Sequence, residues 1–375
     1  MGRRGQGEGS IYKRKDGRYA AAITVENRKR KTFYGKTRRE VQEKLNSALH
    51  EREQGTLVTG QRQLIKSYLE QWVEQVYKPK VKPLTYQQCL SVIRSHLVPA
   101  FGHIPLQKLT PEKVQAVYAQ KLKDGLAPRT IMRIHSVLRS ALENAVRWNL
   151  VSRNIAKLVT LPRADRYEAQ TLTVEQARIL LETAQGSNME ALLLLAVTAG
   201  MRRGELLALR WNDVDFAKKV IYVRRTVGRI AGRGYVETEP KTRSSRRKIV
   251  LPDEVFEVLM MHREQQGQMC IKAGVKWQEH GLVFCNRYGE FMVDWWYTSA
   301  VFHKLLAKAG LPELRFHDLR HSMATILLAA GVHPKVVQER LGHSTITMTM
   351  DTYSHVLPSM QEDVARKLGE MFKGE

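Results

Sequence analysis

The C-terminal half of the chain carries side chains that could act together on a phosphodiester. Arg202 follows a Thr-Ala-Gly break and begins a predicted helix, whose first N–H groups already favour an anion. His317 and Arg320 lie three residues apart in RFHDLRH, so they share one face if a helix starts before them. Arginine presents a planar fork of donors that matches phosphate oxygens. These residues therefore indicate an anion site.

Three further residues add an ammonium, an imidazole and a phenol. Lys241 lies in a turn between two predicted strands, 234–240 and 246–252, where it could stay solvated or reach a bound phosphodiester. His343 follows a Leu-Gly turn, and Tyr353 lies ten positions later. A lone tyrosine usually belongs to the core, so Tyr353 gains chemical meaning only from the other residues. Together they fit metal-free phosphoryl transfer, in which cations stabilise the charge and a hydroxyl attacks.

We expect no metal or nucleotide cofactor. His321 lies four residues after His317, a spacing that can bind zinc on a helix. However, the glutamate of the metalloprotease pattern is absent, and the fixed charge of Arg320 would repel a cation. The chain also lacks paired carboxylates for a two-metal nuclease and a GxxxxGK[ST] loop for ATP. Glu205, three residues after Arg202, is predicted to hold the Arg202 guanidinium in place.

The composition predicts a polyanionic partner. Lys and Arg outnumber Asp and Glu by 61 to 37 in 375 residues, which gives a net charge of +24. Such a charge favours nucleic acid first and an anionic membrane surface second. The N-terminus lacks the apolar run of a secretory signal, and the longest apolar stretch is too short to span a bilayer. Three widely spaced cysteines also fit a reducing cytoplasm.

The N-terminal segment, residues 1–56, is predicted to be a small basic β-sheet followed by a helix. An Asp-Gly turn between alternating runs indicates a hairpin. Thr37 and Glu40 form a capping box that opens a helix to about Gln54. Aromatic residues interleave with the cations. The density of cations on so short a sheet favours a phosphate-binding surface over a merely solvated face. The candidate DNA-binding residues are Lys13, Arg14, Lys15, Arg18, Arg28, Lys29, Arg30 and Lys31.

Residues 62–162 are predicted to form an all-α domain. A helix is expected to open at Thr85 and to end near Pro99. A long amphipathic helix opens at Pro128 and carries two further candidate DNA-binding residues, Arg129 and Arg133. Solvent exposure alone explains either arginine equally well.

The rest of the chain is predicted to be a separate α+β domain. The polar stretch 161–170 contains a proline and is typical of an interdomain linker. From residue 171 to 375, helices alternate with three predicted strands, which cover 219–225 and the two segments on either side of Lys241.

These motifs resemble those of the tyrosine recombinases, specifically the phage and conjugative-transposon integrases. AGMRRGE is similar to the first arginine box of that family, HDLRH to its His-x-x-Arg box and LGH to its third site, with Tyr353 at the position of the nucleophile. The resemblance covers nearly the whole chain. It implies an arm-type DNA-binding domain at 1–56, a SAM-like core-binding domain at 62–162 and a mainly helical catalytic domain at 171–375.

The resemblance also implies a mechanism. The Tyr353 hydroxyl would attack a scissile phosphate, form a 3′-phosphotyrosine and release a 5′-hydroxyl. Arg202 and Arg320 would clamp the non-bridging oxygens, and Glu205 would orient Arg202. The other implied roles are a hydrogen bond to the phosphate from His343, protonation of the leaving oxygen by Lys241, and management of the tyrosine proton by His317. Four strand exchanges would pass through a Holliday junction without ATP or metal.

The implied partners are double-stranded DNA with core-type and arm-type attachment sites, three further copies of the chain in a homotetramer, DNA-bending factors and an excisionase. The implied location is the nucleoid in the cytoplasm of a bacterial host. Two alternatives remain: an integrase-derived DNA-binding regulator, and a type IB-like topoisomerase. The intact catalytic set argues against the first, and the basic N-terminal sheet argues against the second. The tail at 361–372 could pack on a neighbouring protomer or on its own domain.

Overall fold

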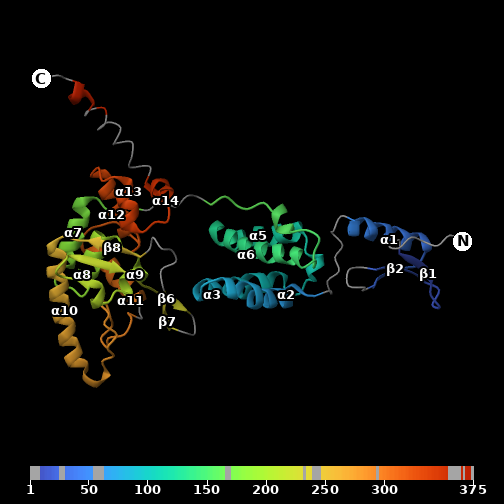
Figure 1. Ribbon diagram of the computed structural model, residues 1–375, viewed down its shortest axis with the longest axis horizontal. Helices are drawn as coiled ribbons and strands as arrows, with labels where there is room; N and C mark the ends of the chain where they lie inside the picture. The colour runs from blue at the N-terminus through green and yellow to red at the C-terminus, as the bar shows by residue number, and fades with distance from the viewer. Residues whose placement is uncertain are drawn as a thin grey trace. The chain divides into compact units, whose positions relative to one another are not determined.

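The structure is a computed structural model that divides the chain into two units, Met1–Arg166 and Tyr167–Glu375 (Figure 1). The boundary falls inside the predicted linker. The described residues are 9–24, 30–53, 63–164, 170–230, 234–238, 246–292, 295–353, 365 and 368–372. Among them, no helix is long and apolar enough to cross a membrane.

The first unit begins with an antiparallel sheet and one helix. The elements are β1 (Ser10–Lys13), β2 (Tyr19–Thr24), β3 (Arg30–Gly35) and α1 (Arg38–Glu53), with strand order β1-β2-β3. Ala21 and Ile23 of β2 pack against Val41 and Leu45 of α1, and these four side chains are almost fully buried. The predicted cap is present, because Thr37 accepts the Glu40 N–H at 3.2 Å.

The rest of the first unit is helical, as predicted. Its elements are α2 (Ile65–Trp72), η2 (Val73–Tyr77), η3 (Lys78–Lys80), α3 (Pro83–Val92), η4 (Ile93–Leu97), α4 (Val98–Phe101), η5 (Leu106–Lys108), α5 (Pro111–Lys123), α6 (Pro128–Arg147) and η6 (Ile155–Leu158). Large buried aromatic side chains fill its core: Tyr68, Trp72, Phe101 and Tyr118.

The helix predicted to open at Thr85 and to end near Pro99 has different bounds. It begins two residues earlier, at Pro83, because proline suits the first helical position, where an N–H would be unpaired anyway. It then continues through η4 into α4 and ends at Phe101. Pro99 lies in the first turn of α4, directly after the π-helical turn of η4, where a missing N–H disturbs the helix least.

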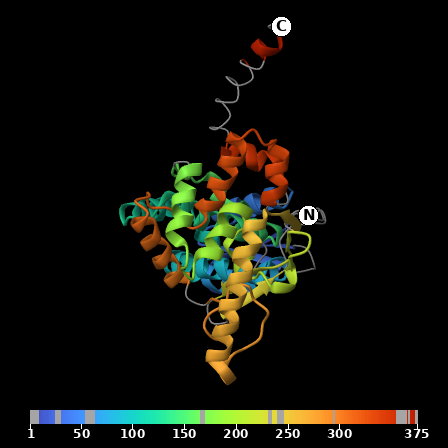
Figure 2. The same ribbon diagram turned by 90° about the vertical axis from the view of Figure 1, so that its left-hand side faces the viewer.

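The second unit surrounds one apolar helix. Its helices are α7 (Val174–Ala184), α8 (Glu190–Ala199), α9 (Arg203–Leu207), η7 (Trp211–Asp213), α10 (Asp253–Ala273), η9 (Gly274–Lys276), α11 (Trp295–Lys308), α12 (Asp318–Ala329), α13 (Pro334–Leu341) and α14 (Ile346–Tyr353). The sequence of α8 is apolar all round, which requires burial, and α7, α10 and α12 all contact it. Helices α12, α13 and α14 lie together at one end of the unit, and the end of α10 extends beyond the other helices (Figures 1 and 2).

The strands of this unit pair differently from the prediction. They are β4 (Val214–Asp215), β5 (Val220–Val223), β6 (Thr226–Ile230), β7 (Gly234–Thr238) and β8 (Arg247–Val250). One sheet has the order β4-β5-β8, and β6 and β7 form a separate hairpin. No strand was predicted at β6, yet β6 is the partner of β7. The strands before and after Lys241 therefore pair with β6 and β5 rather than with each other, and Lys241 itself lies outside the described residues.

Two left-handed glycines end the helices that precede the candidate site. Gly200 follows α8 with φ 60°, and Gly342 follows α13 with φ 67°. A Cβ on Gly200 would lie 1.9 Å from the Met323 Cε, so this position has both a backbone and a packing reason to be glycine. These turns lead the chain directly to Arg202 and His343.

We predict opposite effects for alanine at two glycines of the second unit. Gly200→Ala should destabilise the unit by at least about 1–2 kcal/mol, because alanine resists the left-handed backbone and its methyl group displaces Met323. Gly267→Ala, within α10 and with no atom near its Cβ position, should instead stabilise by about 0.5–1 kcal/mol. Thermal unfolding of the full chain measures both shifts. A Gly200→Ala protein as stable as the parent would contradict this account of the turn.

Candidate active site

The C-terminal turn of α13 is the centre of the candidate site. The Gly342 N–H donates to Glu339 O at 3.0 Å, and the His343 N–H donates to Gln338 O at 3.1 Å. This pair of bonds is the Schellman arrangement that closes a helix with a left-handed glycine. It leaves the next three carbonyls, those of residues 340–342, without helical donors.

Arginines from three separate segments supply the missing donors. Arg340 O accepts from Arg247 Nε at 2.6 Å, Leu341 O from Arg320 Nη2 at 2.7 Å, and Gly342 O from Arg202 Nη2 at 3.2 Å. The donors come from β8, α12 and the residue before α9. The negative end of the α13 dipole favours these cations. One turn thus fastens three distant parts of the unit around His343.

Glu205 links two of these arginines. Its carboxylate, only 3% exposed, accepts from Arg202 Nη1 and from Arg247 Nη2, both at 2.9 Å. The predicted contact between Glu205 and the Arg202 guanidinium is therefore present. Burial alone would raise the pKa of Glu205, but Arg247 and Arg202 outweigh it and hold that pKa below its usual value. A charged Glu205 therefore fixes the direction of both guanidiniums.

Arg320 is buried and connects two helix ends. Besides its bond to the α13 turn, it donates from Nη1 to Gly200 O at 2.6 Å, at the end of α8. Only 3% of the residue is exposed. Buried charge is tolerated when its donors are satisfied, and here main-chain carbonyls satisfy them.

The imidazole of His343 is held next to α14. Its Nδ1 lies 2.9 Å from Thr349 Oγ1, and the residue is 9% exposed. Burial lowers the pKa of His343 to about 3, with Arg320 and Arg202 as further causes. The ring is therefore neutral at neutral pH.

His317 stands at the start of α12 rather than within it. The helix begins at Asp318, so the predicted common helix face with Arg320 does not include His317. Its ring packs edge-on against His321, with ring centroids 5.2 Å apart. Desolvation, followed by His321 and Arg320, lowers the pKa of His317 to about 4, although part of this side chain stays exposed to solvent.

The structure brings five of the predicted site residues together. The other two, Tyr353 and Lys241, are described only in part or not at all. The five are Arg202, Glu205, His317, Arg320 and His343. The backbone of Tyr353 ends α14, which is a helix although its sequence offered no clear helical face. Its side chain and all of Lys241 lie outside the described residues. Within the described part, no group of three potential metal ligands occurs.

Sequence reasoning missed Arg247, which is 6% exposed at its side chain. A signal was present. Ile249 and Leu251 alternate with exposed residues along β8, so Arg247 falls on the same inward face. An arginine at an inward strand position must find buried acceptors, which marks it for a structural or functional role.

The described N-terminal candidates for DNA contact are exposed or half-buried on the sheet: Lys13, Arg14, Lys15, Arg18, Arg30 and Lys31. Arg14 lies over the Tyr34 ring at 5.1 Å, and Arg18 pairs with Asp16 at 2.8 Å. Arg28 and Lys29 lie outside the described residues.

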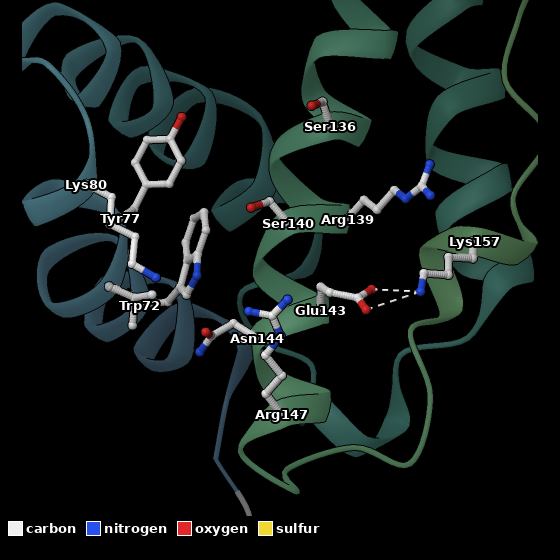
Figure 3. Close-up of a pocket in the computed structure, with 11 residues that line it drawn as sticks. Trp72, Tyr77, Lys80, Ser136, Arg139, Ser140, Glu143, Asn144, Arg147 and Lys157 are labelled. Carbon is white, nitrogen blue, oxygen red and sulfur yellow. Dashed lines mark hydrogen bonds and ion pairs between the residues drawn. The ribbon is translucent and has the colours of Figure 1, made fainter.

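Arg129 and Arg133 are exposed on α6 of the helical part. Farther along the same helix, a cavity of about 580 Å³ opens between η2, α6 and η6. Figure 3 shows Arg139 and Arg147 of α6 at this cavity, with Glu143 paired to Lys157 at 2.9 Å. The exposed basic surface of α6 therefore extends beyond the two predicted arginines, to Arg139 and Arg147.

The chain matches known families along most of its length. Residues 170–360 match the phage integrase family, and residues 64–140 match the N-terminal SAM-like domain of phage integrases. A tyrosine recombinase XerC-like protein of Caldanaerobacter subterraneus subsp. tengcongensis is 30% identical, over 94% of this chain and 96% of that protein.

Two solved structures share the fold. The Tn1549 transposon integrase, in complex with a circular intermediate DNA, is 24% identical with a TM-score of 0.68, and the match covers 81% of this chain and 99% of that one. A lambda integrase tetramer bound to a Holliday junction is 18% identical with a TM-score of 0.59, and the match covers 93% and 96%.

The class of protein follows from these matches: a tyrosine recombinase, an enzyme that cleaves and rejoins DNA. The chain belongs to the phage integrase family, whose activity is site-specific recombination that integrates mobile elements.

We predict that His343 makes the second unit sensitive to acid. An unfolded histidine titrates near 6.5 and the folded His343 near 3, so the unfolded state binds the extra proton between these values. The stability contributed by neutral His343 is complete above pH 6.5 and is lost as the pH falls towards 3. His343→Gln should flatten this dependence by up to about 1.4 kcal/mol per pH unit.

Hydrogen exchange at the amides of α12 and α13, compared between neutral and mildly acid buffer, reports this unit alone. His103→Gln, at an exposed histidine of the first unit, should leave the dependence unchanged. Parallel pH profiles for His343→Gln and the parent protein would contradict the prediction.

Proposed function

We propose that this chain recombines DNA through Tyr353, with Arg202, Arg320 and His343 holding the scissile phosphate. The observation that carries the proposal is the convergence of these three side chains on the α13 turn, directly before the helix that ends at Tyr353. Their donors are already fixed by the fold. Preorganised donors stabilise developing charge without having to rearrange during the reaction.

The arginines differ in what they offer. The Arg202 side chain is 35% exposed, so it is the guanidinium that an incoming phosphate meets, and Glu205 keeps it aimed. Arg320 is buried, and its guanidinium also holds the end of α8. In this proposal both guanidiniums contact non-bridging oxygens, Arg202 from the more exposed side chain.

Thr349 fixes the tautomer of His343 in this proposal. When its hydroxyl donates to Nδ1, the neutral ring carries its hydrogen on Nε2 and can donate it to the phosphate. Because the pKa is near 3, this donor form persists across the physiological range.

In the proposed chemical step, His317 and Lys241 transfer the two protons that the reaction requires. A bond forms between the Tyr353 hydroxyl oxygen and phosphorus, and the bond from phosphorus to the 5′ oxygen breaks. His317, whose pKa of about 4 leaves it neutral, accepts the tyrosine proton. Lys241 gives a proton to the 5′ oxygen. Attack by the 5′-hydroxyl of a partner strand then reverses these steps, so no metal or ATP is consumed.

We further propose that three parts of the chain contact DNA. The sheet at 1–56 would bind arm-type sites, α6 within 62–162 would bind core-type sites, and 171–375 would cleave. A homotetramer would exchange strands through a Holliday junction. The resemblance in fold to the lambda integrase tetramer on such a junction, over 93% of this chain, supports this assembly. DNA-bending factors and an excisionase would act with it in the bacterial nucleoid.

Covalent capture tests the nucleophile. On nicked suicide duplexes made from candidate attachment DNA, with chelator present and ATP absent, the parent protein should form a covalent adduct. Tyr353→Phe should abolish the adduct because it lacks the attacking oxygen. Tyr288→Phe, at another tyrosine of the same unit, is the matched control and should react normally. An adduct that survives Tyr353→Phe would refute the assignment, and binding without any adduct would favour the regulator.

Deletion of residues 1–55 tests the arm-type domain. The shortened chain should still form the adduct at core-type sites, because α6 and the catalytic residues remain. Integration between attachment sites should fall strongly, since the arm-type contacts are lost. Integration and adduct formation are measured side by side, and integration equal to that of the full chain would rule out the arm-binding role.

A further inference from the structure

A second basic site lies where β5, β7 and β8 meet. A cavity of about 700 Å³ opens there, and its lining residues are Tyr222, Val223, Arg224, Arg225, Glu237, Thr238, Arg246, Arg247 and Lys248. Five of these nine residues are basic and one is acidic. The proposed cleavage steps use none of them directly, although Arg247 also anchors the α13 turn. We call this cavity the basic pocket.

Strand register explains the charge of the basic pocket. Tyr222 pairs with Lys248 and Val223 with Arg247, and opposite residues of an antiparallel pair point to the same face. Val223 and Arg247 face the interior. Tyr222 and Lys248 therefore point outward, and Arg224, directly after the end of β5, continues the alternation. Arg224 and Lys248 are exposed, as this pattern requires.

A buried carboxylate, that of Asp213, holds two arginines of the basic pocket in place. Asp213, 1% exposed, accepts from Arg224 Nη1 at 3.1 Å and from Arg225 Nη1 at 2.6 Å. Glu237 also pairs with Arg225 Nε at 3.4 Å. The Arg224 guanidinium lies over the Tyr222 ring, 4.9 Å from its centre, which adds a cation–π contact. Such anchored side chains lose little further freedom when they bind an anion.

The charge balance favours a ligand with negative charge. Among the described residues, the five cations of the basic pocket meet three carboxylates, which are Glu237, Asp213 and Glu205. Gathering like charges costs free energy that an anion would recover. Arginines in a fixed orientation match the paired oxygens of a phosphate better than they match an acceptor with one oxygen.

The basic pocket also adjoins the candidate active site. Arg247 lines the pocket and donates to Glu205, which in turn holds Arg202. We propose that the basic pocket binds a backbone phosphate of the DNA duplex, near the scissile phosphate but distinct from it, through Arg224 and Lys248. This rests on the proposed function. Phosphate binding in the basic pocket would fix the position of the DNA strand, so that the scissile phosphate lies next to Arg202.

Salt dependence of duplex binding tests the contact. Each phosphate contact that is lost should lower the slope of log Kd against log salt by about 0.9. Arg224→Gln and Lys248→Gln should each lower the slope by that amount and weaken binding alike on all sequences. Arg178→Gln, which removes one exposed arginine from α7 where Glu175 and Glu182 pair with it, is the matched control. An unchanged slope in both pocket variants would overturn the proposal.

A phosphate-by-phosphate cycle then locates the contact. Duplexes with one neutral methylphosphonate at each position near the cleavage point are bound by the parent and by Arg224→Gln. At one position the methylphosphonate should weaken duplex binding by the parent protein but have no further effect on binding by the variant. The absence of any such position would overturn the proposal. If Arg224→Gln instead abolished binding of inorganic phosphate while the duplex results matched those of the parent, the pocket would serve a free anion and the DNA assignment would fail.

Failure of this proposal can be told apart from failure of the proposed function. Arg224→Gln leaves the catalytic residues intact, so it should still form the covalent adduct when DNA is saturating. A parent protein without any adduct would overturn the strand-cleavage role whatever the salt slopes show.

Discussion

Three main-chain carbonyls at the end of α13 hold this unit together. A helix end leaves such acceptors without partners, and a buried arginine leaves donors without partners. Here the carbonyl acceptors and the arginine donors bond to each other, so Arg202, Arg247 and Arg320 meet on a single turn. Neither side is stable alone in the interior. The position of His343 follows from the same turn, because the αL glycine before it closes the helix.

The guanidiniums of this cluster act on the neighbouring imidazole. Glu205 bonds Arg202 and Arg247. After burial, the charges of Arg320 and Arg202 contribute to the low pKa of His343. An arriving phosphate would reverse that effect, because a nearby negative charge raises the pKa of an imidazole. The proposed phosphate binding would therefore be coupled to protonation of His343.

Local chemistry made much of this predictable. Gly200 and Gly342 marked the helix ends, and the spacing of HDLRH placed Arg320 near His317. What could not be predicted depends on contacts between distant segments. Strand β6 has little alternation of its own and is defined by its pairing with β7. The alternation around Arg247 indicates an inward side chain, but its partners, Glu205 and Arg340 O, come from remote parts of the chain and could not be predicted.

The use of peptide oxygens as acceptors has a genetic consequence. Every amino acid supplies a carbonyl, so substitution at positions 340 and 341 keeps the arginine anchors as long as the new side chain packs. Gly342 lacks this freedom, since its left-handed backbone penalises other residues. The main-chain anchors themselves therefore restrict the residue type at the third position more than at the first two, where the restriction comes from the side chains of Arg340 and Leu341.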